Sequence, residues 1–392
     1  MPSFVKRQWR ADLEAFGGRR SRRGFVYRAF VPDPIADLEL AIPSDVAESA
    51  AVAAAAVQAL GAHPPGEPSW EALGRHLLRT EAVASSRIEG LQISHRRLAR
   101  ASFGQGHPDM TAESVLGNVA AMEAAIALGS RARPMAPRDV LGIHRVLLKE
   151  TPDRAWAGKL RTSQGWIGGG STPANADFVP PPEDRVPGLL EDLCTFASRD
   201  DVPAVIQAGI VHAQFETIHP FPDGNGRVGR CLIYAVLRRR GLSEGFVLPV
   251  SLAMGSDSRA YIRGLVAFRE GRVAEWCGVF CSAVRMAAEE ATRLGRAVDG
   301  LRQRWRKAAK EPRAGSTASQ IIEALPGYPI LDVGTVEKIA LVSNQAARLA
   351  LMELEATGVV KRINAGKRNR VWEAVGLFEV VEVGERRLRG RA

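Results

Sequence analysis

The sequence predicts a mainly α-helical protein, and two observations carry that prediction. Apolar residues recur three or four positions apart through most of the chain, and buried strands do not alternate with these segments. The chain has 392 residues, 46% of them hydrophobic and 24% charged, which is an ordinary globular composition. It excludes a largely disordered chain and a collagen-like or coiled-coil rod. At about 100 to 200 residues per domain, the length allows two or three domains.

Capping and breaking residues set the expected bounds of the helices. Ser44 is a suitable N-cap, Gly90 is a stop signal, and Pro187 suits a first helical turn. Residues 161–182 lack the helical pattern, because they contain a run of three glycines and, after it, four prolines. An irregular or hairpin-like flap is therefore expected there. The expected helices cover residues 44–60, 70–88, 112–128, 137–148, 187–198, 202–218, 228–239, 257–270 and 274–306.

Membrane insertion, secretion and a disulfide framework are not indicated. One of the longest apolar runs, residues 50–57, is far shorter than the roughly 20 residues that span a bilayer. No apolar segment follows the basic N-terminus as in a secretory signal, so a cytoplasmic protein is expected. The four cysteines are too few for a disulfide framework. Cys277 and Cys281 lie four apart on an apolar helix, where buried thiols are expected rather than metal ligands.

The net charge of +10 is concentrated at the N-terminus, where residues 1–28 hold eight basic and two acidic side chains. A basic patch of this kind attracts nucleic acid or other polyanions. A solvated, mobile arm accounts for the same composition, and the sequence does not choose between the two.

Residues 219–230 read His-Pro-Phe-Pro-Asp-Gly-Asn-Gly-Arg-Val-Gly-Arg and gather the groups that phosphoryl chemistry needs. His219 can take a proton near neutral pH, and Asp223 offers the oxygen ligands that Mg²⁺ prefers. The Gly-Asn-Gly turn can expose backbone N–H groups to an anion where a helix begins. Arg227 and Arg230 are three apart, so they share a helix face and could clamp phosphate oxygens.

Three other interpretations of this run are weaker. Its glycines spell the Gly-x-Gly-x-x-Gly of dinucleotide-binding folds, but that fingerprint follows a buried strand, whereas the spacing of residues 206–218 is helical. A zinc site from His212, His219 and Asp223 has no recognised spacing, and His212 is expected to be a packed or hydrogen-bonded core residue. A plain helix corner would need glycines, but not a histidine, an aspartate and two arginines together.

The run matches the Fic family signature, His-x-Phe-x-(Asp/Glu)-Gly-Asn-Gly-Arg-x-x-Arg, at every specified position, and the chain resembles this family over roughly residues 30–300. Fic enzymes are mostly adenylyltransferases, which move AMP from ATP to a hydroxyl side chain of a target protein and release pyrophosphate. The resemblance implies a Fic-type helical core with a short hairpin flap, ATP as substrate and Mg²⁺ as cofactor. It also implies a target protein that bears a Ser, Thr or Tyr hydroxyl.

The same resemblance implies a role for each residue of the signature. His219 is expected to deprotonate the target hydroxyl, Asp223 to bind Mg²⁺, and Phe221 to anchor the loop in the core. Residues 161–182 resemble the flap that holds the target's backbone as an added strand, although a plain surface loop fits their sequence nearly as well. The residues expected to contact the phosphates are Gly224, Asn225, Gly226, Arg227 and Arg230.

Residues 85–90, Ser-Ser-Arg-Ile-Glu-Gly, resemble the family's inhibitory sequence, (Ser/Thr)-x-x-x-Glu-(Gly/Asn), which Ser85 opens. The resemblance implies that Glu89 pairs with Arg230, the arginine that the γ-phosphate needs, so that ATP binds only unproductively. It further implies removal of AMP, with Glu89 positioning a water molecule. A solvated glutamate before a C-terminal glycine is the alternative.

The C-terminal region is predicted to be a winged helix-turn-helix. Helices are expected over residues 335–340 and 344–356, with Ser343 as N-cap of the second. Residues 313–392 carry 12 basic and 9 acidic side chains, so the region is only mildly basic, and DNA binding and protein docking both stay open. A basic hairpin wing is expected from Lys361, Arg362, Lys367, Arg368 and Arg370.

We therefore expect three parts: an N-terminal region with an inhibitory helix at residues 1–107, a Fic catalytic core at 108–300, and a winged helix-turn-helix domain at 313–380. The expected function is a self-inhibited protein adenylyltransferase. The alternative is a DNA-binding regulator whose Fic core senses a nucleotide. The intact His219 favours the transferase, because a sensor needs phosphate contacts but no base. Monomer and homodimer are both open.

Overall fold

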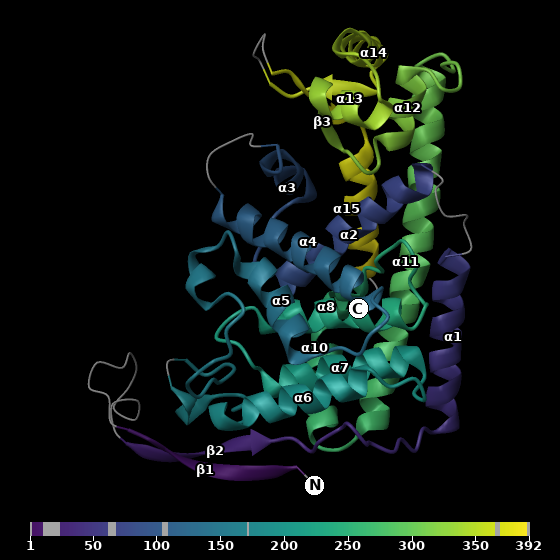
Figure 1. The fold of residues 1–392 in the computed structure, drawn as a ribbon. Coiled ribbons are helices and arrows are strands. Elements are labelled where there is room, and N and C mark those ends of the chain that lie inside the picture. The colour runs from purple at the N-terminus through teal and green to yellow at the C-terminus, as the bar shows by residue number, and fades with distance from the viewer. Residues whose placement is uncertain are drawn as a thin grey trace. The chain divides into compact units, whose positions relative to one another are not determined.

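The computed structural model describes residues 2–10, 24–61, 68–103, 109–170, 172–364 and 369–389. Within these ranges the protein is mainly helical, as expected, with fifteen α-helices, three short 3-10 helices and five strands (Figure 1). None of the described helices combines the length and the apolar character that crossing a bilayer requires. The chain forms two compact units from interleaved segments. Unit 1 comprises Met1–Ala54, Ala120–Leu242 and Arg259–Ser282, and unit 2 comprises Ala55–Val119, Ser243–Ser258 and Ala283–Ala392.

Two helices form the centre of unit 1. Helix α7 (Ala204–Ile218) is buried from Val205 to Ile218, because it packs on several sides, and polar side chains such as Gln207 and Glu216 are buried among the apolar ones. Helix α8 (Asn225–Arg239) follows the motif loop and crosses α7 closely. A Cβ added at Gly229 would lie 3.0 Å from Phe215 of α7, so this glycine permits the close crossing. Helices α5 (Pro137–Leu148), α6 (Val186–Ala197) and α10 (Ser258–Arg269) also belong to unit 1, while three longer helices lie only partly in it.

The N-terminus forms a hairpin that the sequence pattern did not reveal. Strands β1 (Ser3–Trp9) and β2 (Phe25–Val31) pair antiparallel, with Phe4 opposite Phe30. Arg7 Nη2 lies 2.5 Å from Glu183 Oε1, so part of the basic excess is neutralised within unit 1. The Phe30 N–H donates to the carbonyl of Val179 at 2.9 Å, which joins the hairpin to the flap. Residues 11–23, which hold four of the basic side chains, lie outside the described ranges.

Most of the expected helices are confirmed within a few residues. Long helices include α1 (Ser44–Gly61), α2 (Pro68–Ile88), α4 (Met110–Gly129) and α11 (Val273–Ala308). Helix α8 begins at Asn225, three residues before the expected start. Sequence analysis missed α3 (His95–Ala101), α9 (Val250–Ser256), α12 (Thr317–Ala324) and α15 (Leu377–Arg389), of which the first three are too short for periodicity to stand out.

Unit 2 packs its helices around several small apolar clusters. One cluster joins four helices through Ala84 of α2, Leu252 of α9, Met286 of α11 and Leu388 of α15. Glu81 of α2 is fully buried, and its carboxylate accepts hydrogen bonds from the N–H and the hydroxyl of Ser251 in α9. Helix α2 is therefore held at Glu81 and Ala84 by segments that lie far away in the sequence.

The C-terminal region contains the elements expected there. Helices α13 (Val333–Ala340) and α14 (Asn344–Ala356) flank a tight turn, and Ser343 Oγ accepts from the Ala346 N–H at 3.3 Å, which confirms the N-cap. Strands β3 (Ile330–Asp332), β5 (Val371–Ala374) and β4 (Val360–Arg362) form an antiparallel sheet in that order. The wing residues Lys367 and Arg368 lie outside the described ranges. Assignment of this region as a winged helix stays a prediction.

Candidate functional site

His219 ends helix α7 and turns the chain into the motif loop. Its N–H donates to the carbonyl of Phe215 at 2.9 Å, and its backbone is left-handed, with φ 49° and ψ 60°. Such a conformation is uncommon for a residue with a Cβ and costs about 1–3 kcal/mol, so surrounding contacts must hold it. The side chain is half-buried. A helix therefore precedes the motif, not a strand, which agrees with our rejection of a dinucleotide-binding fingerprint.

The loop is fixed in the core by reciprocal hydrogen bonds. Asn225 Oδ1 accepts from the Phe221 N–H and Asn225 Nδ2 donates to the Phe221 carbonyl, both at 2.8 Å. Phe221 is buried, as expected of an anchor. The side-chain amide of Asn225 thus shapes the loop, so a contact of this residue with phosphate would come from its backbone N–H. Gly224 caps α8 with φ 79°, a conformation that favours glycine.

His144 of α5 packs against the motif loop. Sequence analysis did not identify this residue. Its ring stacks on Phe221, with 3.7 Å between centroids. The Gly158 N–H donates to His144 Nδ1 at 3.0 Å, so the ring proton is on Nε2, which donates to the Asp223 carbonyl at 3.1 Å. Burial lowers the pKa of His144 to about 4, so the ring is neutral. A lone histidine on an apolar helix gives no sequence signal for such a role.

The loop just before α8 supplies a carboxylate, and the first turns of α8 supply two buried arginines. Asp223 Oδ2 lies 2.8 Å from Arg227 Nη2, and the Asp223 side chain is 54% exposed. Arg230 is buried, with 1% of its surface exposed. Because the first N–H groups of a helix have no intrahelical acceptor, they and the arginines create a positive environment for an anion.

The side chains near the motif loop suit Mg²⁺ better than zinc. Among the described residues, no group of three or more His, Cys, Asp and Glu side chains is arranged to hold a metal ion. Mg²⁺ commonly uses one or two carboxylates together with substrate phosphates, so the single exposed carboxylate of Asp223 beside an anion site fits this ion. His212 Nε2 lies 2.9 Å from the Tyr261 hydroxyl in the core, as expected of a packed histidine. Burial raises the pKa of Cys277 to about 12, and the four cysteines are buried thiols.

The structure brings the signature together in unit 1 and places the inhibitory motif in unit 2. The residues in unit 1 are His219, Asp223, Gly224, Asn225, Gly226, Arg227 and Arg230. Ser85 is buried near the end of α2, and Glu89 is exposed just beyond its last residue. Gly90 follows with φ 81°, as expected of a helix stop. The neighbouring Ser86 accepts a hydrogen bond from Asn118 Nδ2 at 3.1 Å.

Comparison with known families agrees with the resemblance carried by the motif loop. Residues 134–237 match the Fic/DOC family, and residues 47–127 match the Fic/DOC family N-terminal region. The first match contains the motif loop, and the second contains α2.

Two curated relatives are both named as protein adenylyltransferases. The chain is 46% identical over 68 residues to a probable protein adenylyltransferase of Aquifex aeolicus, covering 17% of this chain and 21% of that protein. It is 28% identical over 150 residues to the protein adenylyltransferase fic-1 of Caenorhabditis elegans, covering 36% and 28%. The matched segments thus span less than a third of either relative.

Solved structures show the same fold. A Fic family protein from Desulfovibrio desulfuricans G20 superposes with a TM-score of 0.53 at 22% identity, covering 86% of this chain and 98% of that one. A segment of Fic-1 from C. elegans superposes with a TM-score of 0.51 at 19% identity, covering 63% and 72%. At these identities the likeness concerns the fold alone.

Proposed function

We propose that the protein is an adenylyltransferase that transfers AMP from ATP to a hydroxyl side chain of a target protein. The observation that supports it most is the motif loop, in which a half-buried histidine precedes a helix N-terminus with two buried arginines. The names of the curated relatives point the same way. The proposed core spans residues 108–300, after an N-terminal region at 1–107.

In the proposed reaction His219 accepts the proton of the target hydroxyl, whose oxygen attacks the α-phosphorus of ATP. The new bond joins that oxygen to the α-phosphorus, the bond to the bridging oxygen breaks, and pyrophosphate leaves with the electron pair. The N–H groups at the start of α8, including those of Gly224, Asn225 and Gly226, and the side chains of Arg227 and Arg230 bind phosphate oxygens.

Asp223 would hold Mg²⁺ together with the phosphates in this proposal. Bound Mg²⁺ would neutralise charge on the pyrophosphate leaving group. Arg227 orients the Asp223 carboxylate through its 2.8 Å contact, and His144 fixes the backbone of Asp223 at its carbonyl.

To test for AMP transfer, the purified protein is incubated with Mg²⁺, a cell lysate and ATP that is labelled at either the α- or the γ-phosphate. Covalent label from the α-position only, on the chain itself or on lysate proteins, is the expected result. Label from the γ-position only would show phosphoryl transfer. No label from either, with ATP bound, would favour the nucleotide-sensing alternative.

We also propose that the activity is self-inhibited through the motif that Ser85 opens, with Glu89 engaging Arg230. The motif sequence supports this, and so does the secure anchoring of the α2 segment that carries it. Removal of AMP, with Glu89 positioning water, belongs to the same proposal.

The region at residues 313–380 is proposed to be a winged helix with a docking role. Leu349 and Met352 of α14 are 59% and 43% exposed, and Leu341 in the preceding turn is 89% exposed. An apolar face on this helix suits a protein surface better than phosphates, which call for Lys and Arg. In β4, Lys361 Nζ lies 3.0 Å from Glu373, which reduces the charge available to a polyanion.

We therefore expect the full chain to show no steep salt dependence of DNA binding. The measurement is fluorescence anisotropy with a random-sequence duplex between 50 and 200 mM salt, where six or more phosphate contacts would change affinity by about 10³-fold or more. Binding with that slope, lowered by the combined change Arg362→Gln and Arg370→Gln, would instead establish a DNA-binding wing.

A further inference from the structure

Arg161 stands at the start of the flap and is buried, with 5% of its surface exposed. Its Nε donates to the carbonyl of His219 at 2.9 Å, Nη1 to that of Ser163 at 3.0 Å, and Nη2 to that of Pro181 at 2.5 Å. Its backbone N–H donates to the Pro220 carbonyl at 3.0 Å. Among the described residues, every hydrogen-bond acceptor of this guanidinium is a backbone carbonyl.

These contacts join three pieces of backbone at one point. Ser163 and Pro181 lie at the two ends of the flap, which is closed between them by a bridge of Ile167 with Phe178. The third piece is the left-handed turn at His219. Burial lowers the pKa of Arg161 to about 10, so the side chain is still charged at neutral pH and its hydrogen bonds are charge-assisted. Only arginine offers donors in a rigid planar fork that can reach three directions at once.

We propose that Arg161 is a positioning residue that ties both ends of the flap to the carbonyl of His219. The inference rests on the proposed function, in which His219 accepts the proton of the target hydroxyl, and on the flap holding the target's backbone, as the family resemblance implies. One guanidinium then sets the distance between the bound hydroxyl and the base, and it also holds the His219 backbone in its uncommon conformation.

The test compares Arg161→Gln and Arg161→Lys with Arg185→Gln, a control arginine whose side chain is 65% exposed in the same unit. We expect transfer from α-labelled ATP to fall about 10²-fold in both Arg161 variants, the loss typical of reacting groups misplaced by about 1 Å. ATP affinity, measured by calorimetry, should change less than twofold. In Arg161→Gly, added guanidinium ion should restore part of the activity.

Hydrogen exchange gives a readout that does not depend on activity. The Ile167 N–H, which donates to Phe178, should exchange faster in Arg161→Gln while the amides of α7 keep their protection. Unchanged flap exchange, or unchanged transfer in a folded variant, overturns the proposal. If the wild-type chain transfers nothing but flap exchange still rises, the proposed function fails while the tie itself stands.

A second group of contacts lies at the end of α2, at Arg87 within the motif that begins at Ser85. Glu385 of α15 is 7% exposed, and its carboxylate lies 3.0 Å from Arg87 Nη1 and accepts a hydrogen bond from His95 Nε2 at 2.8 Å. Burial alone would raise the pKa of Glu385, but the hydrogen bond from His95 and the charge of Arg87 outweigh it and lower the pKa to about 2. The carboxylate is therefore ionised and tightly held.

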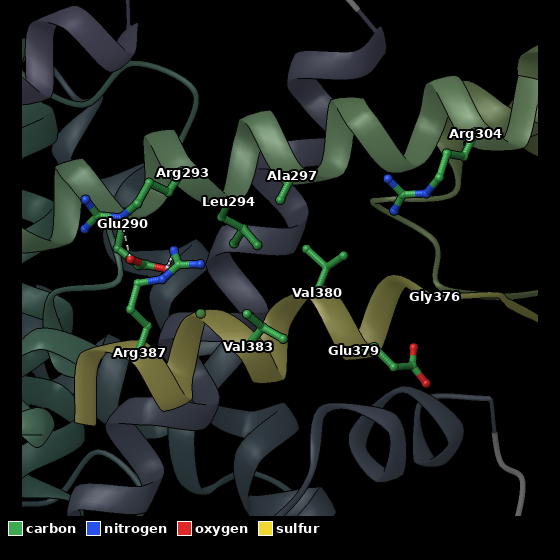
Figure 2. A pocket seen from close by; sticks show the side chains of 11 residues that line it. Glu290, Arg293, Leu294, Ala297, Arg304, Gly376, Glu379, Val380, Val383 and Arg387 are labelled. Atoms are coloured by element: carbon green, nitrogen blue, oxygen red, sulfur yellow. Dashed lines mark hydrogen bonds and ion pairs between the residues drawn. The ribbon is translucent and has the colours of Figure 1, made fainter. Parts of the chain in front are cut away.

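The opposite side of α15 is less well packed. A cavity of about 370 Å³ separates it from α11, with Leu294, Val380 and Val383 among its lining residues (Figure 2). At one end of the cavity Glu290 of α11 accepts from Arg293 at 2.9 Å, and Arg387 of α15 lies 3.7 Å from it. A helix that borders a cavity on one side loses packing there, so its local opening is easier than that of the core.

We infer that α15 is an intramolecular clamp on the inhibitory motif. By holding Arg87 through Glu385 it keeps the end of α2, and hence Glu89, in place, and displacement of α15 releases the inhibition. This inference rests on the self-inhibition proposed above. It makes α15, which begins at Leu377 within the end of the proposed docking region at residues 313–380, the element through which a docked partner would act.

The test measures self-labelling from α-labelled ATP in the full chain. Glu385→Gln should raise labelling toward the level of Glu89→Gly, whereas the control Glu382→Gln on the same helix should not. Arg87→Gln, which removes the pair from the other side, should act like Glu385→Gln. The double variant with Glu89→Gly should label no faster than Glu89→Gly alone, since there is no inhibition left to release.

The outcomes separate the two hypotheses. If Glu89→Gly activates and neither Glu385→Gln nor Arg87→Gln does, the clamp is wrong while self-inhibition holds. If Glu89→Gly does not activate, self-inhibition is wrong and the clamp is rejected with it. Helix content and thermal unfolding of each variant show whether α15 and the core are folded.

Discussion

His219→Ala is expected to lower AMP transfer by about 10²- to 10⁴-fold, the contribution of a positioned general base. ATP binding should be largely unchanged, because the phosphate contacts proposed for Arg227, Arg230 and the start of α8 do not involve the imidazole. Label transfer from α-labelled ATP gives the rate, and calorimetry gives the affinity for ATP.

The backbone at His219 makes a structural control necessary. Since this residue adopts a left-handed conformation with φ 49°, we suggest His219→Asn as a second variant, because Asn tolerates that conformation better than Ala and lacks a basic ring. Both variants should lose transfer alike. Full activity in either folded variant would remove His219 from the mechanism.

Glu89→Gly should raise self-labelling or target labelling well above wild type. The proposed physical reason is that Arg230 is released and can then bind the γ-phosphate in the productive pose. An ion pair that is partly buried is costly to leave half made, so the freed arginine should also bind a triphosphate more readily. The measurement is the initial rate of α-label incorporation, together with the ATP dissociation constant.

The matched control combines Glu89→Gly with Arg230→Ala. The double variant should not be activated, because the freed arginine is the cause of the gain. Equal labelling by wild type and Glu89→Gly, with ATP bound and the fold intact, would show that Glu89 is only a solvated residue at a helix end.

Much of the helical framework could be predicted because its signals are local. Apolar spacing identified α7 and α11, and Ser343 caps α14 as expected, since caps and periodicity depend on residues within one or two turns. The β1–β2 hairpin was missed. Its two strands are separated by residues 10–24, so their pairing is not a local signal. The basic composition of this region fits a solvated arm and a strand equally well.

The residues of the candidate site also fall into two groups, those that the sequence identified and those that only the structure revealed. The signature residues from His219 to Arg230 were identified because their types and spacing are specific in the sequence itself. His144 and Arg161 were not identified, although they hold the loop at the Asp223 and His219 carbonyls. A single buried histidine or arginine has no pattern in its own neighbourhood, and its role depends on acceptors that only the folded chain brings near.

By itself, the sequence determined the helical class, the order of the main helices and the chemistry of the motif loop. The tertiary structure alone decided which charged side chains are buried and what satisfies them. Arg87 and Glu385 are 298 positions apart, and the Arg161 guanidinium meets carbonyls of both the flap and the motif loop. The physical reason is that a buried charge must be paired or hydrogen-bonded, while its partners can come from any segment that packing brings beside it.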